Sequence, residues 1–260
     1  MSTGTYLYCV RRPKKGRGGS ASKPPKGLAG AKEPRVLAAD GYELVVATVP
    51  LAKYAAEVIE PRLRDLDWVS KCAGAHEAVI EHAALGGTVV PAKLFTIFGS
   101  DDRAVTHVLR GKKDLARVMA RIEGCDEWGL RILFDEVAAA KAELAAVTEP
   151  KKKSAPSGTG FLLRKKAQTE VKRRLVGDAR AEADELYDAL AKRAKRALRR
   201  PPPSQDLAAR VLLDAVFLVE SKSTKGFTAT VGKTAQRLAD EGFHVTLTGP
   251  WPAYSFIGGR

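Results

Sequence analysis

The order of strand-like and helix-like patterns in the N-terminal half of the sequence constrains the fold most strongly. Runs rich in β-branched and aromatic residues predict strands, and apolar residues spaced three or four apart predict helices. Strands are expected at 5–10, 42–49, 88–98 and 127–134, and helices at 50–63, 65–85, 100–122 and 136–147. This β-β-α-β-α-β order is close to the ferredoxin-like arrangement, an antiparallel sheet with two helices on one face.

Proline and glycine predict interruptions inside these elements. Ile59 and Leu63 share a helical spacing, but Pro61 predicts a kink or break between them. Gly111 is expected to interrupt the helix at 100–122. Pro91 lies inside the strand at 88–98 and indicates a sheet edge or a bulge there.

A second domain is predicted after residues 150–160, PKKKSAPSGTG, whose composition is typical of a linker. Beyond it, apolar residues recur every three or four positions until Pro201, which predicts a long amphipathic helical stretch. A strand at 211–220, a helix at 224–242 and a strand at 243–248 follow. In the last strand, Phe243, Val245 and Leu247 are expected on one face and the residues between them on the other. We therefore expect an α+β protein with an N-terminal ferredoxin-like domain (1–149) and a C-terminal helix-rich domain with a small sheet (161–260).

The net charge of +14 is concentrated in two segments. Residues 11–35 carry nine Lys or Arg and one acid, and residues 151–200 carry sixteen Lys or Arg and six acids. Residues 11–34 have almost no apolar side chains, so a flexible basic loop is expected. Such localised charge concerns partners and solubility rather than fold. It leaves open a nucleic-acid-binding protein that uses this loop and the basic helix.

Composition argues against several other classes. The sequence has no apolar run long enough to cross a bilayer, so we expect no membrane span. The N-terminus MSTGTYLYCV does not look like a secretory signal. Three cysteines without a CxxC pair favour free thiols in a reducing compartment. A cytoplasmic protein is the expectation.

Two motifs imitate chemical sites but have the wrong spacing. HEAVIEH places His76 and His82 six residues apart, whereas a shared helix face for zinc needs four. GFTATVGKT has Phe227 where a phosphate-binding loop needs its first glycine, so an early helix or turn is expected there. No nucleophile lies in a recognisable catalytic setting. We expect no catalytic residues, metal, cofactor or small-molecule substrate.

The chain ends in an unusually aromatic segment, LTGPWPAYSF. Prolines stiffen this backbone, so little entropy is lost when it docks, and the aromatic side chains supply large apolar areas. Either the segment folds back onto its own domains or part of it stays exposed and grips a partner. The candidate partner-binding residues are Pro250, Trp251, Pro252, Tyr254 and Phe256.

Several stretches, in order, resemble the gas vesicle protein L/F family (GvpL/GvpF). They are TYLYCV, HEAVIEHAA, TVVPAKLFTIFGS, CDEWGLRILFD, GTGFLLRKK, VLLDAVFLVE and the C-terminal LTGPWPAYSF, which is the most specific. One departure is Pro-Ala-Tyr at 252–254, where the family usually has Pro-Pro-Tyr.

The resemblance implies a two-domain α+β protein without enzymatic activity. It further implies an accessory or minor structural role in building gas vesicles, with contacts to the main shell protein and other assembly proteins. The basic nucleic-acid-binding protein is the alternative. Association with gas vesicles in the cytoplasm is the expected location.

Overall fold

The chain divides into two compact units, each with its own sheet. The computed structural model describes residues 2–14, 23–147, 158–201 and 209–258. Unit 1 comprises Met1–Asp126 and Trp251–Arg260, and unit 2 comprises Glu127–Pro250. The protein is α+β, as predicted. The division at residues 126 and 127 differs from the expected ranges of 1–149 and 161–260, and the C-terminal residues return to unit 1.

The sheet of unit 1 has the strand order β2-β3-β1-β4, and β5 also pairs with β1. The strands are β1 (Thr3–Pro13), β2 (Arg35–Ala39), β3 (Tyr42–Pro50), β4 (Gly87–Pro91) and β5 (Ile97–Phe98). All of these pairs are antiparallel. Asp40 and Gly41 join β2 to β3 with φ values of 46° and 82°. Two positive φ values in a two-residue loop are typical of the hairpin turn for which Asp-Gly is favoured.

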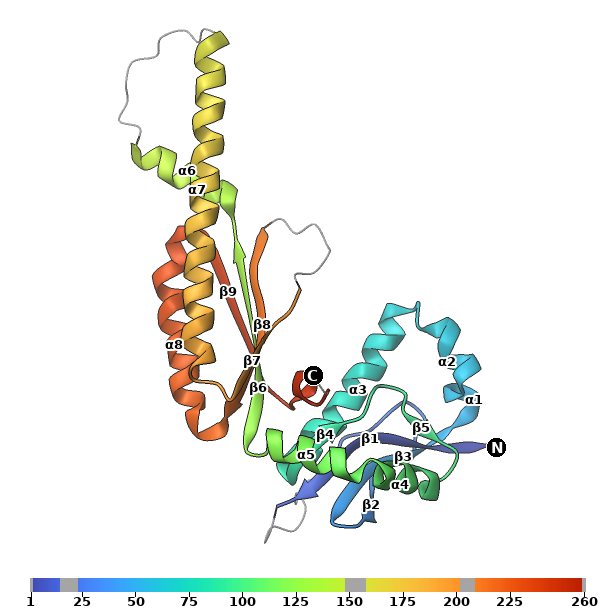
Figure 1. Ribbon diagram of the computed structural model, residues 1–260. Helices are drawn as coiled ribbons and strands as arrows, with labels where there is room; N and C mark the ends of the chain where they lie inside the picture. Colours follow the sequence, from blue (N-terminus) through green and yellow to red (C-terminus); the bar gives the residue numbers. More distant parts are fainter. Residues whose placement is uncertain (1, 15–22, 148–157, 202–208, 259–260) are drawn as a thin grey trace. The chain divides into compact units, whose positions relative to one another are not determined.

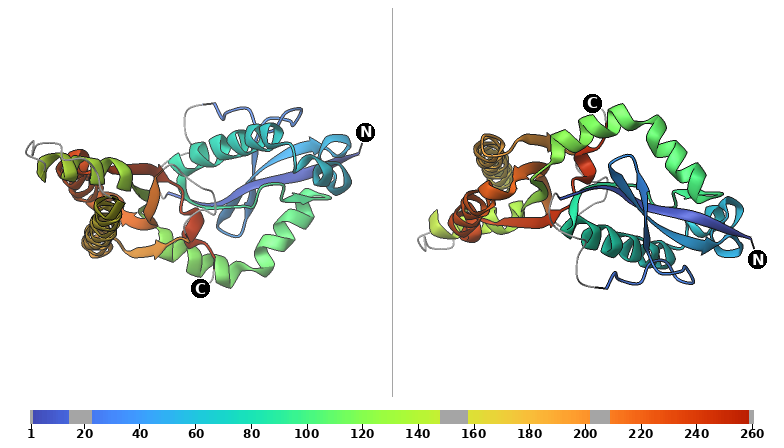
Figure 2. Two further views of the ribbon diagram at one scale, coloured as in Figure 1. Left: turned by 90° about the horizontal axis from the view of Figure 1, so that it is seen from above. Right: turned by 90° about the horizontal axis from the view of Figure 1, so that it is seen from below.

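Helices cover both faces of this sheet, whereas the sequence predicted two helices on one face. They are α1 (Leu51–Tyr54), α2 (Ala56–Arg62), α3 (Leu66–Leu85), α4 (Asp101–Arg110) and α5 (Lys112–Ile122). Side chains alternate along β3, so Val45 joins α3 in one core and Leu44 joins α4 and α5 in the other. Figure 2 shows α3 on one side of the sheet and α4 and α5 on the other.

The break expected near Glu60 is not found: α2 runs through Glu60 and Pro61 and ends at Arg62, and the helix expected at 50–63 is interrupted at Ala55 instead. Pro61 is tolerated because it lies in the last turn of α2, and α3 begins after Asp65. The Asp65 carboxylate accepts a hydrogen bond of 3.0 Å from the Trp68 backbone N–H, which makes it a helix N-cap. Gly111 separates α4 from α5. The strand expected at 88–98 is divided into β4, which ends at Pro91, and β5.

Unit 2 has the order β-α-α-β-β-α-β, which is the β-α-β-β-α-β order typical of ferredoxin-like domains with one additional helix, although the sequence predicted a ferredoxin-like arrangement for residues 1–149. The elements are β6 (Cys125–Phe134), α6 (Glu136–Val147), α7 (Gly158–Ala191), β7 (Arg196–Arg199), β8 (Arg210–Glu220), α8 (Thr224–Leu238) and β9 (Phe243–Trp251). The sheet order is β7-β8-β6-β9. Figure 1 shows α7 and α8 beside this sheet. The difference arises because β6, expected in the first sheet, pairs within the second.

The core of unit 2 joins α7 and α8 to the sheet. Leu186 and Leu190 of α7 and Phe227 of α8 are buried with Phe217 of β8. The Phe217 and Phe227 ring centroids are 5.3 Å apart. The segment that imitates a phosphate-binding loop is therefore part of α8, and its Phe227 fills the core. In β9, the alternation of buried and exposed residues predicted from the sequence is confirmed.

The expected flexible loop and linker are only partly described. Arg11 is buried in β1 and forms an ion pair with Glu43 at 2.6 Å. Leu28 is buried, and its backbone N–H donates a hydrogen bond of 3.2 Å to the Tyr8 hydroxyl. Parts of 11–34 are therefore anchored to unit 1, at Arg11 and at Leu28, where a wholly flexible loop was expected. Most of the expected linker, residues 150–157, lies outside the described residues, and residues 158–160 begin α7.

Candidate protein-binding surface

Gly249 lies near the end of β9, just before the aromatic C-terminal segment, and no other residue could easily replace it. Gly249 has a φ of +124°, and the peptide bond to Pro250 is cis. A Cβ atom at position 249 would lie 2.8 Å from the Glu127 carbonyl oxygen and 3.2 Å from the Trp128 ring. The chain packs so closely at this position that only glycine, which has no Cβ atom, fits there without strain.

The five candidate residues of this segment differ widely in exposure. Phe256 is 1% exposed, whereas Trp251 is 37% exposed. Tyr254 is half-buried and packs against the core that β1 and α3 share. Pro250 is exposed and Pro252 is half-buried. The structure therefore does not place the five on one exposed face, and Trp251 and Pro250 are the ones accessible to a partner.

A second apolar feature lies where α2 meets α3. Leu63 is 50% exposed and Leu66 is 78% exposed, although both are large aliphatic residues. A single exposed leucine is ordinary, but two exposed leucines within four residues make an apolar feature of the kind that marks binding surfaces. Arg62, Leu63, Leu66, Trp68 and Phe95 are named here the α2–α3 surface.

Aromatic stacking orders the rest of the α2–α3 surface. The Trp68 and Phe95 rings are stacked, with centroids 5.3 Å apart and planes inclined by 9°. The Arg62 guanidinium lies 4.2 Å from the centroid of the Trp68 ring, within the range of a cation–π interaction. The two aromatic rings are half-buried. These contacts order the Arg62 and Trp68 side chains, which lie within a few residues of Leu63 and Leu66 in the sequence.

The backbone that carries Phe95 has an unusual conformation, with a φ of 63°. Bulky side chains rarely adopt this left-handed region, which costs about 1–2 kcal/mol per residue. The Phe95 N–H donates a hydrogen bond of 3.2 Å to the Tyr6 hydroxyl. That hydroxyl lies 2.8 Å from His76 Nδ1, and His76 Nε2 lies 3.2 Å from the Ala92 carbonyl oxygen. Strain of this kind persists only where the surroundings enforce it.

One arrangement of protons satisfies this buried chain. If His76 is neutral with its proton on Nε2, it donates to Ala92 and accepts from the Tyr6 O–H, which in turn accepts from Phe95. Burial lowers the pKa of His76 from its ordinary value of 6.5. Burial also raises the pKa of Tyr6. Both shifts favour the neutral forms that the chain requires.

The histidines of HEAVIEH therefore have different surroundings. His76 is buried inside the hydrogen-bonded chain, and His82 is half-buried near the end of α3. Within the described ranges, no three His, Cys, Asp or Glu side chains gather in a way that could hold a metal ion. No helix in the part of the chain that the structure describes is both long and apolar enough to cross a membrane.

The basic helix α7 is partly neutralised within unit 2. Arg174 forms ion pairs with Glu143 and with Asp178, the latter at 3.7 Å. Arg173 forms an ion pair with Glu170 at 2.5 Å. Exposed pairs of this kind add little stability, but they reduce the charge that this part of α7 presents to a polyanion.

Sequence patterns did not reveal the α2–α3 surface. Helical spacing placed Leu63 on the same face as buried Ile59, but the helix ends one residue earlier and leaves Leu63 outside it. The available signal was the string RLRDLDW directly after Pro61, in which charged residues surround each leucine. Phe95 gave no signal, because its positive φ depends on contacts that are distant in sequence.

Comparison with known proteins places the chain in a family. The model of the family "Gas vesicle synthesis protein GvpL/GvpF" matches residues 4–258. Gas vesicle protein L of a Streptomyces species is 29% identical over 97% of this chain and 92% of its own length. Gas vesicle protein F of the same organism is 27% identical over 97% and 99%, respectively.

A solved structure supports the same fold. The crystal structure of GvpF from an Anabaena species matches with a TM-score of 0.71 and 18% identity, covering 100% of this chain and 98% of that one. At this identity the match shows the fold alone, while the family model spans nearly every residue of both units. The chain therefore belongs to the GvpL/GvpF family of gas vesicle synthesis proteins.

Proposed function

We propose that this protein is an accessory or minor structural component of gas vesicle assembly that binds the main shell protein. The observation that carries the proposal is the α2–α3 surface, where Leu63 and Leu66 are exposed within a few residues of Arg62 and Trp68, whose side chains stack. Family membership supports the assembly role. We further propose that Trp251 makes a second contact, and that other assembly proteins bind elsewhere on the chain.

Two physical effects favour binding here: the burial of apolar side chains, and the ordering of neighbouring side chains before the partner arrives. Fully burying one leucine contributes about 1.5–3 kcal/mol. Leu66 has most of its surface available for this. The stack of Arg62, Trp68 and Phe95 is held by contacts inside unit 1. A partner therefore loses less affinity to the ordering of side chains than it would on a mobile surface.

The proposed role is binding rather than catalysis, without a cofactor, in the cytoplasm and in association with gas vesicles. The GvpL/GvpF family carries the description of a gas vesicle synthesis protein, which fits such a role. The nucleic-acid alternative receives less support, because the ion pairs of Arg173 and Arg174 offset part of the charge of α7.

Co-purification with the main shell protein tests the proposal. The double variant Leu63→Ser with Leu66→Ser removes the exposed apolar groups without touching the core. Its matched control is Val137→Ser with Leu198→Ser, because these residues of unit 2 are 60% and 37% exposed. We expect the first variant to lose the shell protein and the control to retain it. Equal recovery with both variants, or equal loss, would contradict the assignment.

A further inference from the structure

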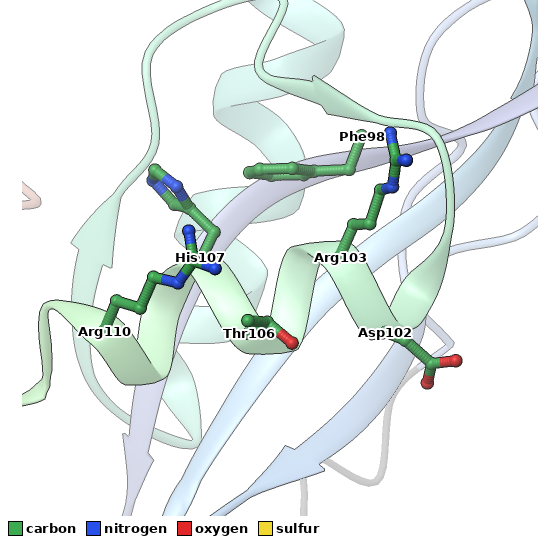
Figure 3. A pocket seen from close by; sticks show the side chains of 6 residues that line it. All are labelled: Phe98, Asp102, Arg103, Thr106, His107 and Arg110. Atoms are coloured by element: carbon green, nitrogen blue, oxygen red, sulfur yellow. The ribbon is translucent and has the colours of Figure 1, made fainter.

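A groove of about 370 Å³ lies along the exposed side of α4. It shares no residue with the α2–α3 surface. Its lining consists of Phe98, Asp102, Arg103, Thr106, His107 and Arg110, and is named here the α4 groove. In Figure 3 the Phe98 ring lies above the helix between Arg103 and His107. The α4 groove is open to solvent, because every helical residue in its lining is exposed.

The lining of the α4 groove is positive on balance, because it holds two arginines, Arg103 and Arg110, against one acid, Asp102. Among the residues that the structure describes, neither Arg103 nor Arg110 forms an ion pair through its guanidinium, whereas nearby Arg35 pairs with Asp101 at 2.9 Å. The Asp102 carboxylate points away from the other labelled side chains in Figure 3. Two guanidiniums with free donors are suited to carboxylates, which they bind with paired hydrogen bonds.

An aromatic ring gives the α4 groove an apolar part. Phe98 is held by strand pairing between β5 and β1, in which it lies opposite Thr5. Its ring centroid is 5.1 Å from that of His107. The ring is half-buried, so one part packs on the core of unit 1 and another part is open to the groove. A purely ionic ligand would leave this apolar area unused.

We propose that the α4 groove binds an acidic segment of a partner protein. One carboxylate of the segment meets Arg103, a second meets Arg110, and an apolar side chain between them rests on Phe98. The two arginines are seven residues apart, which is about 10 Å along a helix axis. An extended chain rises about 3.3 Å per residue, so acids three residues apart match this distance.

This interaction does not depend on shell-protein binding at the α2–α3 surface. It gives unit 1 a second partner class, recognised mainly by charge rather than by apolar area. Because both guanidiniums are exposed, the interaction should be reversible and should weaken as salt rises.

Fluorescence anisotropy with the full chain tests the proposal. The probe is a labelled peptide with the core Glu-Ala-Leu-Glu, and the control peptide has the core Gln-Ala-Leu-Gln. Measurements are made at about 0.15 M salt, where distant surface charges are largely screened. Arg103→Gln with Arg110→Gln should weaken binding of the acidic peptide by about tenfold or more, because charged hydrogen bonds are lost. The amide peptide should bind weakly to every variant.

A charge-matched variant distinguishes binding of the peptide at the α4 groove from general attraction of an acidic peptide to a protein of net charge +14. Arg64→Gln with Lys71→Gln removes the same charge from exposed positions of unit 1 near and on α3, which packs on the opposite face of the sheet from α4. It should leave binding within about twofold, since its charges are screened from the groove. Equal weakening by both double variants would overturn the proposal, as would no measurable binding by the unaltered chain.

The role of the ring distinguishes a peptide site from a small-anion site. Phe98→Ala, once circular dichroism shows that it is folded, should weaken binding of the acidic peptide severalfold. Inorganic phosphate should compete poorly, because it spans neither both guanidiniums nor the ring. If phosphate displaces the peptide at comparable concentration and Phe98→Ala has no effect, the α4 groove is a small-anion site and the peptide proposal fails.

Discussion

Removing the Tyr6 hydroxyl should destabilise unit 1 more than removing any single neighbouring hydroxyl. The Tyr6→Phe change deletes one oxygen atom but breaks two buried hydrogen bonds, from the Phe95 N–H at 3.2 Å and to His76 Nδ1 at 2.8 Å. Each buried group left without a partner costs about 1–3 kcal/mol. We therefore expect the free energy of opening unit 1 to fall by about 2–4 kcal/mol.

Tyr8 provides the matched control. Its ring lies 4.7 Å from that of Tyr6, it is equally buried, and its hydroxyl accepts one hydrogen bond from the Leu28 N–H. Tyr8→Phe should cost about 1 kcal/mol. Native-state hydrogen exchange of the β3 amides reports unit 1 alone, which avoids treating two units as one transition. If Tyr6→Phe costs no more than Tyr8→Phe, the buried chain does not hold Phe95 as argued.

Three further predictions test other parts of the structure. Burial lowers the pKa of His76 in the folded protein below its ordinary value of 6.5. The unfolded chain therefore takes up the proton at a higher pH, so stability is lost as pH falls below about 6.5. The pH dependence of unfolding should be flatter for His76→Gln than for the unaltered chain, and an unchanged profile would contradict this. Gly249 has a φ of +124°, whereas Gly177 occupies an open helical position. Gly249→Ala should therefore cost about 1–3 kcal/mol in thermal or urea unfolding of unit 2, and Gly177→Ala should be neutral or stabilising. Phe95→Gly should be more stable to unfolding than Phe95→Ala by about 1 kcal/mol, because glycine tolerates a left-handed backbone; equal stability would show that the backbone there is not strained.

Local features of the fold were predictable because they depend on neighbours in sequence. Gly111 separates α4 from α5 where the pattern placed a break, and Ser100 caps α4 by accepting from the Arg103 N–H. The alternation along β9 correctly separated its buried from its exposed residues. Propensity, capping and periodicity act within a few residues, so a single sequence contains them.

Long-range pairing could not be predicted in the same way. The strand pattern of β6 was correct, but it does not specify which sheet the strand joins, so the ferredoxin-like order was assigned to the wrong part of the chain. The edge strand β7 was expected to be helical, because Arg196 and Arg199 flank too few apolar residues to indicate a strand. Charged residues on an edge strand are a common protection against unwanted pairing.

The candidate surfaces were also only partly predictable from the sequence. The aromatic residues from Trp251 to Phe256 were found as a group, but their different burial depends on packing against unit 1. The α2–α3 surface depends on Tyr6 and Phe95, which are 89 residues apart in the sequence. The α4 groove needed the structure as well, because the sequence does not show that the Phe98 side chain lines the same groove as Arg103 and Arg110.

Site-specific photo-cross-linking tests the central claim most directly. A photoreactive amino acid at Leu66, which is 78% exposed, should form a covalent adduct with the main shell protein during vesicle assembly. The same group at Val137, which is 60% exposed in unit 2, should form little or none. Strong adducts at Leu66 alone are the predicted result. An adduct at Val137 without one at Leu66 would contradict the claim that the α2–α3 surface binds the shell protein.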